Sequence, residues 1–179
     1  MEHSAPGRRV ALVTGAGGNG SGRAIARRFA REGASIIVSD IDDDGGIETV
    51  RLIEANGGQA IFHPCDVRDE NAVRHLILSA EERFGSLDYL INNASAPFHP
   101  EAPLEYWKEA VETDLLGAMY ATRAAIDVFR RHGGGAVVNM SSTSALPHGR
   151  TPPAPSYDAA KAGLLRLTTM LAFLGDAEN

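Results

Sequence analysis

The sequence contains a single cysteine, Cys65, among 179 residues. One cysteine cannot close a disulfide within the chain, and the six histidines show none of the spacings that are typical of a zinc site. No apolar run approaches the roughly 18 residues that a membrane-spanning helix needs. The N-terminal segment MEHSAPGRR also lacks the apolar stretch of a secretory signal. We therefore expect a cytoplasmic protein without a metal site and without a membrane partner.

A surplus of basic residues is also lacking. Lysine and arginine number 17 against 23 aspartates and glutamates, which gives a net charge of −6, and neither sign gathers into a long block. This balance argues against a nucleic-acid partner. The G-x-S-x-G motif of serine hydrolases is missing as well. A hydrophobic content of 44% with 22% charged residues is ordinary for a globular protein, and the length suits one domain over residues 1–179.

Short apolar runs alternate along the chain with longer stretches of helical periodicity. The predicted strands lie near 9–14, 35–40, 59–63, 87–92 and 135–141, and the predicted helices near 21–32, 44–56, 69–83, 103–132 and 157–174. The strands are rich in valine and isoleucine on both faces, which is typical of a parallel sheet covered by helices on both sides. The pattern predicts an α/β fold, a Rossmann-type doubly wound sheet that stops after its fifth helix.

A glycine-rich segment, TGAGGNGSGRAIA at 14–26, follows the first predicted strand and opens the first helix. Glycines in this context let backbone N–H groups approach a pyrophosphate, and the helix N-terminus adds partial positive charge. Asp40 ends the second strand, 18 residues beyond Gly22, where a carboxylate can accept hydrogen bonds from a ribose 2′-OH. This order predicts dinucleotide binding, with NAD favoured because Asp40 would repel a 2′-phosphate. The alternative is that Asp40 only caps the next turn.

The segment SYDAAKAG places Tyr157 and Lys161 four residues apart, on one face of a helix. A phenol with the usual pKa of about 10 is a poor base at neutral pH unless its anion is stabilised. Lys161 could supply that stabilisation. Taken alone, the pair also fits an ordinary surface helix.

The glycine turn, Asp40 and the Tyr157–Lys161 pair together resemble the short-chain dehydrogenase/reductase family, from Arg9 to the end of the chain. Further motifs of the family stand after the third, fourth and fifth strands. The matching residues are Thr14, Gly15, Gly20 and Gly22 for TGxxxGxG, with one extra residue between Gly15 and Gly20; Asp66 and Val67 for Asp-Val; Asn92 to Ser95 for Asn-Asn-Ala-Gly; Ser141 and Ser142 for Ser-Ser; and Tyr157 to Lys161 for YxxxK.

The resemblance implies an NAD-dependent oxidoreductase that transfers a hydride between nicotinamide and a secondary alcohol or ketone. It assigns Tyr157 as the acid/base, Lys161 to the nicotinamide ribose and Ser142 to the substrate oxygen, with Ser144 as the alternative by spacing. It also implies a homo-oligomer, a dimer or tetramer. The cofactor-binding residues that it implies are Thr14, Gly15, Gly20, Gly22, Asp40, Asp66, Val67, Asn93, Ala94, Tyr157 and Lys161.

Two departures from the family pattern stand out. Asp114, in DLLG, replaces an asparagine that helps to hold a water leading to the lysine. Its carboxylate could hold water, could pair with Lys161, or could face solvent or bond within its helix. The chain is also shorter than is usual for the family, which leaves a second reading: a cofactor-binding or structural remnant with little turnover. A chain ending at Asn179 would expose the edge of its fifth strand and favour oligomers.

Overall fold

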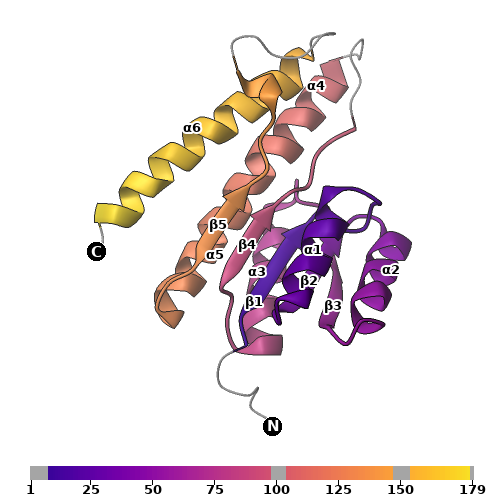
Figure 1. Ribbon diagram of the computed structural model, residues 1–179. Helices are drawn as coiled ribbons and strands as arrows, with labels where there is room; N and C mark the ends of the chain where they lie inside the picture. The colour runs from indigo at the N-terminus through magenta and orange to yellow at the C-terminus, as the bar shows by residue number, and fades with distance from the viewer. Residues whose placement is uncertain (1–7, 98–103, 147–153, 178–179) are drawn as a thin grey trace.

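The computed structural model describes residues 8–97, 104–146 and 154–177, with side chains to residue 172. Its centre is a five-stranded parallel sheet with the strand order β3-β2-β1-β4-β5 (Figure 1). The strands are β1 (Val10–Thr14), β2 (Ser35–Asp40), β3 (Gln59–Pro64), β4 (Tyr89–Asn92) and β5 (Ala136–Asn139).

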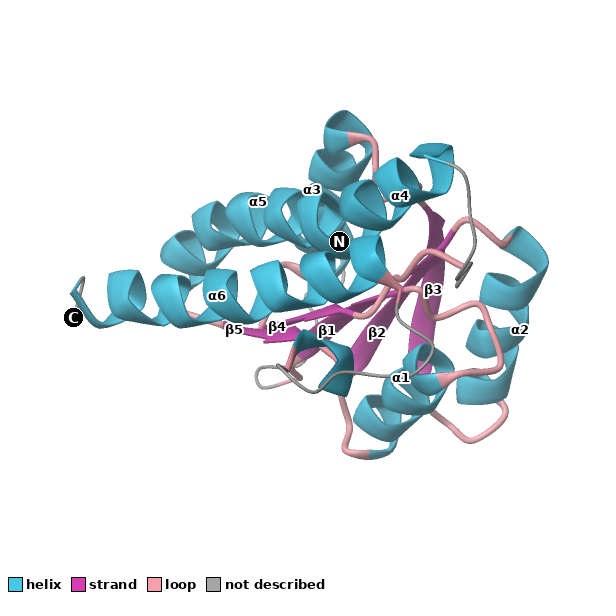
Figure 2. Ribbon diagram, turned by 90° about the horizontal axis from the view of Figure 1, so that it is seen from above, coloured by secondary structure: helices cyan, strands magenta, loops and turns pink. Residues whose placement is uncertain are grey.

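Helices connect the strands and cover both faces of the sheet. Figure 2 shows α1 and α2 on one face and α3, α5 and α6 on the other. The helices are α1 (Ser21–Arg31), α2 (Asp43–Glu54), α3 (Glu70–Phe84), α4 (Leu104–Val111), α5 (Gly117–His132) and α6 (Pro155–Ala177), with a π-helical turn η1 (Glu112–Leu116) and a 3₁₀ turn η2 (Thr143–Ala145).

The central strand β1 shows why the sheet is covered on both sides. All five of its residues are buried. Val10 and Leu12 belong to a core that includes side chains of α3 and α5, whereas Ala11 and Val13 belong to a second core with side chains of α1 and α2. Successive residues of a strand point to opposite faces, so an uninterrupted apolar run is what a two-sided core requires.

The predicted fold class is confirmed, and most element boundaries agree within two residues. The helix predicted at 103–132 needs a correction, because η1 interrupts its described part, 104–132, with a π-helical turn. A π turn inserts one residue into the helix and so changes which side chains face inward. The helical periodicity of the sequence does not reveal such an insertion.

Two absences concern the described part of the chain only. No helix there is both long and apolar enough to cross a membrane. No group of three or more histidine, cysteine, aspartate or glutamate side chains is arranged there to hold a metal ion. His3, His99 and His148 lie outside the described residues.

Candidate active site

A cavity of about 480 Å³ opens at the carboxyl ends of the strands. It lies where the chain leaves β1 and β4 for opposite faces of the sheet, the usual place for a ligand in a doubly wound fold. The lining comes from the glycine turn and the loops after β2, β3 and β4, and includes Gly15, Gly18, Gly20, Ser21, Gly22, Asp40, Asp66, Val67, Asn93 and Ala94. Most of the predicted cofactor-binding residues therefore surround one space.

The glycine turn contains two positions at which only glycine fits. Gly15 has a φ of +65°, a conformation that other residues rarely adopt. A Cβ atom on Gly22 would lie 2.1 Å from the carbonyl oxygen of Gly15 and 2.5 Å from Nδ2 of Asn93. Backbone and side chain close this space completely, so the first turn of α1 is pressed against the end of β1.

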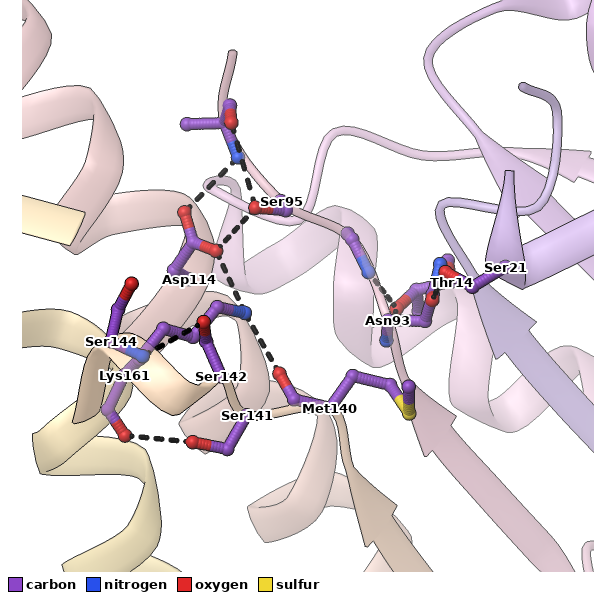
Figure 3. Close-up of polar contacts among 12 residues, drawn as sticks. Thr14, Ser21, Asn93, Ser95, Asp114, Met140, Ser141, Ser142, Ser144 and Lys161 are labelled. Atoms are coloured by element: carbon purple, nitrogen blue, oxygen red, sulfur yellow. Dashed lines mark hydrogen bonds and ion pairs between the residues drawn. The ribbon is translucent and has the colours of Figure 1, made fainter. Parts of the chain in front are cut away.

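Thr14 and Asn93 tie the ends of β1 and β4 together (Figure 3). The buried Thr14 hydroxyl accepts hydrogen bonds from the backbone N–H groups of Asn93, at 3.1 Å, and Ala94, at 3.2 Å. The Asn93 amide in turn donates to the carbonyl oxygens of Thr14, at 3.1 Å, and Gly15, at 2.9 Å. These bonds fix the floor of the cavity.

Asp40 lies at the rim of the cavity with its carboxylate already held by backbone groups. Oδ2 accepts the N–H of Gly17 at 2.7 Å, and Oδ1 accepts the N–H of Asp42 at 3.1 Å. The cap of α2 is Asp42, whose side chain accepts the N–H of Gly45. Asp40 therefore contributes to the following turn, as the alternative reading expected, and also faces the cavity.

Asp66, which follows β3, also lines the cavity and forms a two-pronged ion pair with Arg68, with Nη2 at 2.7 Å from Oδ2. This hydrogen bonding to Arg68 holds the pKa of Asp66 below its usual value. Val67 is buried against Gly117, where a Cβ atom would lie 2.9 Å from Cβ of Val67. Cys65 also lines the cavity, and burial raises the pKa of its thiol to about 11, which keeps it protonated.

Lys161 and Asp114 meet in the buried region behind the cavity (Figure 3). Nζ of Lys161 lies 2.9 Å from Oδ1 of Asp114, and it also donates to the carbonyl oxygen of Met140 at 2.8 Å. Asp114 accepts two more hydrogen bonds, from Oγ of Ser95 at 2.6 Å and from the N–H of Ala96 at 3.1 Å. The sequence left open whether Asp114 holds water, pairs with Lys161 or faces solvent, and in the structure it pairs with Lys161.

Tyr157 lies one turn before Lys161 on α6, half-buried. Nζ of Lys161 is 5.5 Å from the centre of the Tyr157 ring. Thus the predicted pair does share one helix face, and the lysine lies on the buried side of it.

Ser141 and Ser142 follow β5, and Ser141 connects the end of this strand to α6. Oγ of Ser141 donates to the carbonyl oxygen of Lys161 at 3.1 Å, whereas Oγ of Ser142 accepts the N–H of Ser144 at 3.1 Å and begins η2 (Figure 3). Ser142 is partly exposed, and Ser144 is buried.

Sequence reasoning missed two contributors to this region. Ser95 was visible as a serine in place of the family's glycine, but its bond to Asp114 was not anticipated. The Met140 carbonyl that holds Lys161 is a backbone group, for which the sequence carries no signal.

The parallel sheet and the glycine turn at its carboxyl ends define a Rossmann-type fold. The chain belongs to the short-chain dehydrogenase/reductase family, since the model of the short chain dehydrogenase family matches residues 9–178. This family uses a nicotinamide cofactor, NAD(H) or NADP(H).

Individual relatives agree with this assignment. The chain is 36% identical over 167 residues to an uncharacterized oxidoreductase of Thermotoga maritima, covering 92% of this chain and 64% of the relative. It is 38% identical to L-rhamnose 1-dehydrogenase (NAD(P)+) of Azotobacter vinelandii, covering 89% and 64%. A short chain dehydrogenase from Mycobacterium smegmatis superposes with a TM-score of 0.85 at 35% identity, over 93% of this chain and 70% of that one. The chain thus spans just under two thirds of the length of these two curated relatives.

Proposed function

We propose that this chain is a single unit that binds NAD and carries the catalytic residues of an oxidoreductase acting on a secondary alcohol or ketone. The observation that carries the proposal is the position of Lys161, buried beside the ring of Tyr157 and behind a cavity lined by a glycine turn. A cofactor site and an acid/base candidate thus lie at the same edge of the sheet.

The cavity suits a dinucleotide. Space at Gly15 and Gly22 is limited to glycine, so the backbone of the turn comes close to any group bound there. The N-terminus of α1 opens directly from this turn and supplies unpaired N–H groups, which favour an anion such as a pyrophosphate. We assign the adenosine ribose to Asp40 and the adenine to Asp66 and Val67, the residues at the ends of β2 and β3.

A nicotinamide bound in this cavity would supply the hydride donor or acceptor. In the direction of alcohol oxidation, the substrate carbon loses a hydride, the hydroxyl proton passes to the phenolate oxygen of Tyr157, and the C–O bond becomes a carbonyl. The Ser142 hydroxyl holds the substrate oxygen. Lys161 stabilises the phenolate by its charge. An ammonium has three N–H groups, and two are taken by Asp114 and Met140, which leaves one for the cofactor ribose.

The test of this mechanism is the absorbance of the reduced nicotinamide, followed against a panel of secondary alcohols and ketones. We expect Tyr157→Phe to lower the rate at least about 100-fold, as is usual when a general acid/base is lost. Tyr89→Phe is the matched control, because Tyr89 lies at the opposite end of the sheet, at the start of β4. Equal rates for Tyr157→Phe and the parent would refute the assignment.

NAD is favoured over NADP because the Asp40 carboxylate at the cavity rim would meet a 2′-phosphate with like charge. The relative from Azotobacter vinelandii carries both cofactors in its name, so a direct measurement is required. We expect a lower dissociation constant for NADH than for NADPH in the parent and a narrower gap in Asp40→Ala. Equal constants in the parent would contradict the preference.

A second candidate function is cofactor binding with little turnover. The observation that favours it is the direct pairing of Asp114 with Lys161, because the carboxylate offsets the positive charge that would stabilise a Tyr157 phenolate. NADH binding without turnover of any alcohol or ketone in the panel would support this alternative.

We also propose that the protein is a homo-oligomer that works in the cytoplasm. Several large apolar side chains are exposed on α4 and α5, namely Leu104, Tyr106, Trp107 and Met119. The edge of β5 is a further candidate contact, because β5 pairs only with β4 within the described residues. Light scattering that finds a stable monomer at micromolar concentration would contradict this proposal.

A further inference from the structure

The glycine turn of this chain is one residue longer than the family pattern, and the structure shows what holds the extra length. Gly17 lies between Gly15 and Gly20, and both the N–H and the carbonyl group of its backbone are hydrogen-bonded to side chains. Its N–H donates to Oδ2 of Asp40 at 2.7 Å, and its carbonyl oxygen accepts a hydrogen bond from Nη2 of Arg23. An acidic and a basic side chain thus fix one glycine.

Arg23, in the first turn of α1, uses its whole guanidinium for this purpose. Besides Gly17, Nη2 reaches the carbonyl oxygen of Gly45 at 3.1 Å, Nε donates to Oγ1 of Thr49 at 2.8 Å, and Nη1 donates to Oδ1 of Asn19 at 2.9 Å. The planar fork of arginine can satisfy such divergent acceptors at once, which a lysine cannot do.

Thr49 completes the arrangement from α2, which lies beside α1 on the same face of the sheet (Figure 2). Its side chain is fully buried, and its hydroxyl oxygen lies 2.7 Å from the carbonyl oxygen of Ala16. Two successive carbonyl groups of the turn, at Ala16 and Gly17, are therefore held by side chains of two different helices.

The glycine turn packs closely against α2 and the end of β2. A Cβ atom on Gly45 would lie 2.6 Å from the carbonyl oxygen of Gly17, and one on Gly17 would lie 2.9 Å from Cβ of Asp40. The turn is therefore packed closely against α2 and Asp40, and the hydrogen bonds of Arg23 and Thr49 hold it there.

We propose that Arg23 and Thr49 are positioning residues for the adenosine half of the cofactor, acting through Gly17 on Asp40. Neither residue lines the cavity, whereas Gly18, Gly20 and Asp40 do. The inference rests on the proposed cofactor binding. Without the hydrogen bonds from Arg23 and Thr49, a turn with glycines at 15, 17 and 18 samples many conformations. The free-energy cost of ordering it is then added to the free energy of cofactor binding.

The test uses Thr49→Val and Arg23→Met, with Arg31→Met on the exposed end of the same helix as the matched control. Calorimetry measures the dissociation constant for ADP-ribose, which requires no turnover. We expect the dissociation constant to rise about tenfold in Thr49→Val and Arg23→Met, as the loss of several ordering hydrogen bonds allows, and to stay unchanged in Arg31→Met. The KM for NADH should rise in parallel, with kcat at saturating NADH within about twofold of the parent.

A general loss of stability would lower the concentration of active enzyme and so the apparent kcat, rather than raise KM alone. Binding is therefore measured well below the unfolding temperature of each variant. If Arg23→Met does not fold, Thr49→Val and Arg23→Lys decide. If the parent binds ADP-ribose and the folded Thr49 and Arg23 variants bind it equally well, this inference is wrong and the proposed cofactor binding stands. Failure of the parent to bind ADP-ribose overturns the proposed cofactor binding and the inference with it.

Discussion

Lys161 and Asp114 form an ion pair in which both side chains are almost completely removed from solvent, with 2.9 Å between Nζ and Oδ1. Removing two charges from water is costly, and a buried pair persists only where further hydrogen bonds complete it. Here the Ser95 hydroxyl and the Ala96 N–H complete the carboxylate, and the Met140 carbonyl holds the ammonium. The π-helical turn that contains Asp114 directs this side chain into the site.

Asp114→Asn separates the stabilising role of this pair from its effect on rate. Removing one partner of a buried pair leaves the other charge uncompensated, so we expect the free energy of unfolding to fall by about 3 kcal/mol. The rate per folded molecule should rise or stay unchanged, because a neutral amide no longer competes for the charge of Lys161. Denaturant unfolding and steady-state rates measure the two effects.

The matched control for this variant is Asp127→Asn, which removes an exposed carboxylate that pairs with Arg123 on α5. We expect it to change neither stability nor rate appreciably. A large drop in rate for folded Asp114→Asn would show that the carboxylate is required.

Ser95→Ala removes the hydroxyl that donates to Asp114 and leaves the backbone bond of Ala96 in place. We expect a loss of about 1 kcal/mol in unfolding free energy. The loss should shrink when Ser95→Ala is made in the Asp114→Asn background, because the bond to a charged acceptor is stronger than the bond to an amide. Strictly additive losses in this double-mutant cycle would contradict a direct coupling of the two residues.

Gly22→Ala and Gly20→Ala test the close approach in the glycine turn. A methyl group at Gly22 meets the Gly15 carbonyl, and we expect a destabilisation of about 3 kcal/mol together with weaker NADH binding. A methyl group at Gly20 has no atom within 4 Å, so the fold should keep its stability. Thermal unfolding of the two variants gives the comparison, and equal stability would contradict it.

Stability in acid should depend on Glu81, which joins α3 to Arg131 and His132 of α5. Hydrogen bonding to Arg131 lowers the pKa of Glu81 below its usual value of 4.5. A carboxyl group with a lowered pKa in the folded state stabilises the protein above its unfolded pKa, and this contribution is lost as the pH falls through the folded pKa.

We therefore expect the unfolding free energy of the parent to decline below about pH 4.5, and Glu81→Gln to show a shallower decline. Glu32→Gln is the control, because Glu32 is an exposed residue at the C-terminal end of α1 that pairs with Arg28. Identical pH profiles for Glu81→Gln and the parent would refute a role for this carboxylate.

The sequence predicted those parts of the fold and site that depend on local patterns. The glycine turn, the order of strands and helices, and the Tyr157–Lys161 face all follow from periodicity and from motifs within a few residues of each other. The partner of Asp114 could not be chosen from the sequence, because solvent, water and Lys161 were all compatible with a helical aspartate. The bonds from Arg23 to Gly17 and Thr49 depend on how two helices pack, which no local pattern encodes.

The strand order β3-β2-β1-β4-β5 also bears on how the chain can fold while it is being synthesised. The central strand β1 is made first, β2 and β3 add outward on one side, and β4 and β5 then add outward on the other. No strand has to insert between two that are already paired. A single helix connects β1 to β2 and another connects β2 to β3, so these three strands can pair before β4 has left the ribosome.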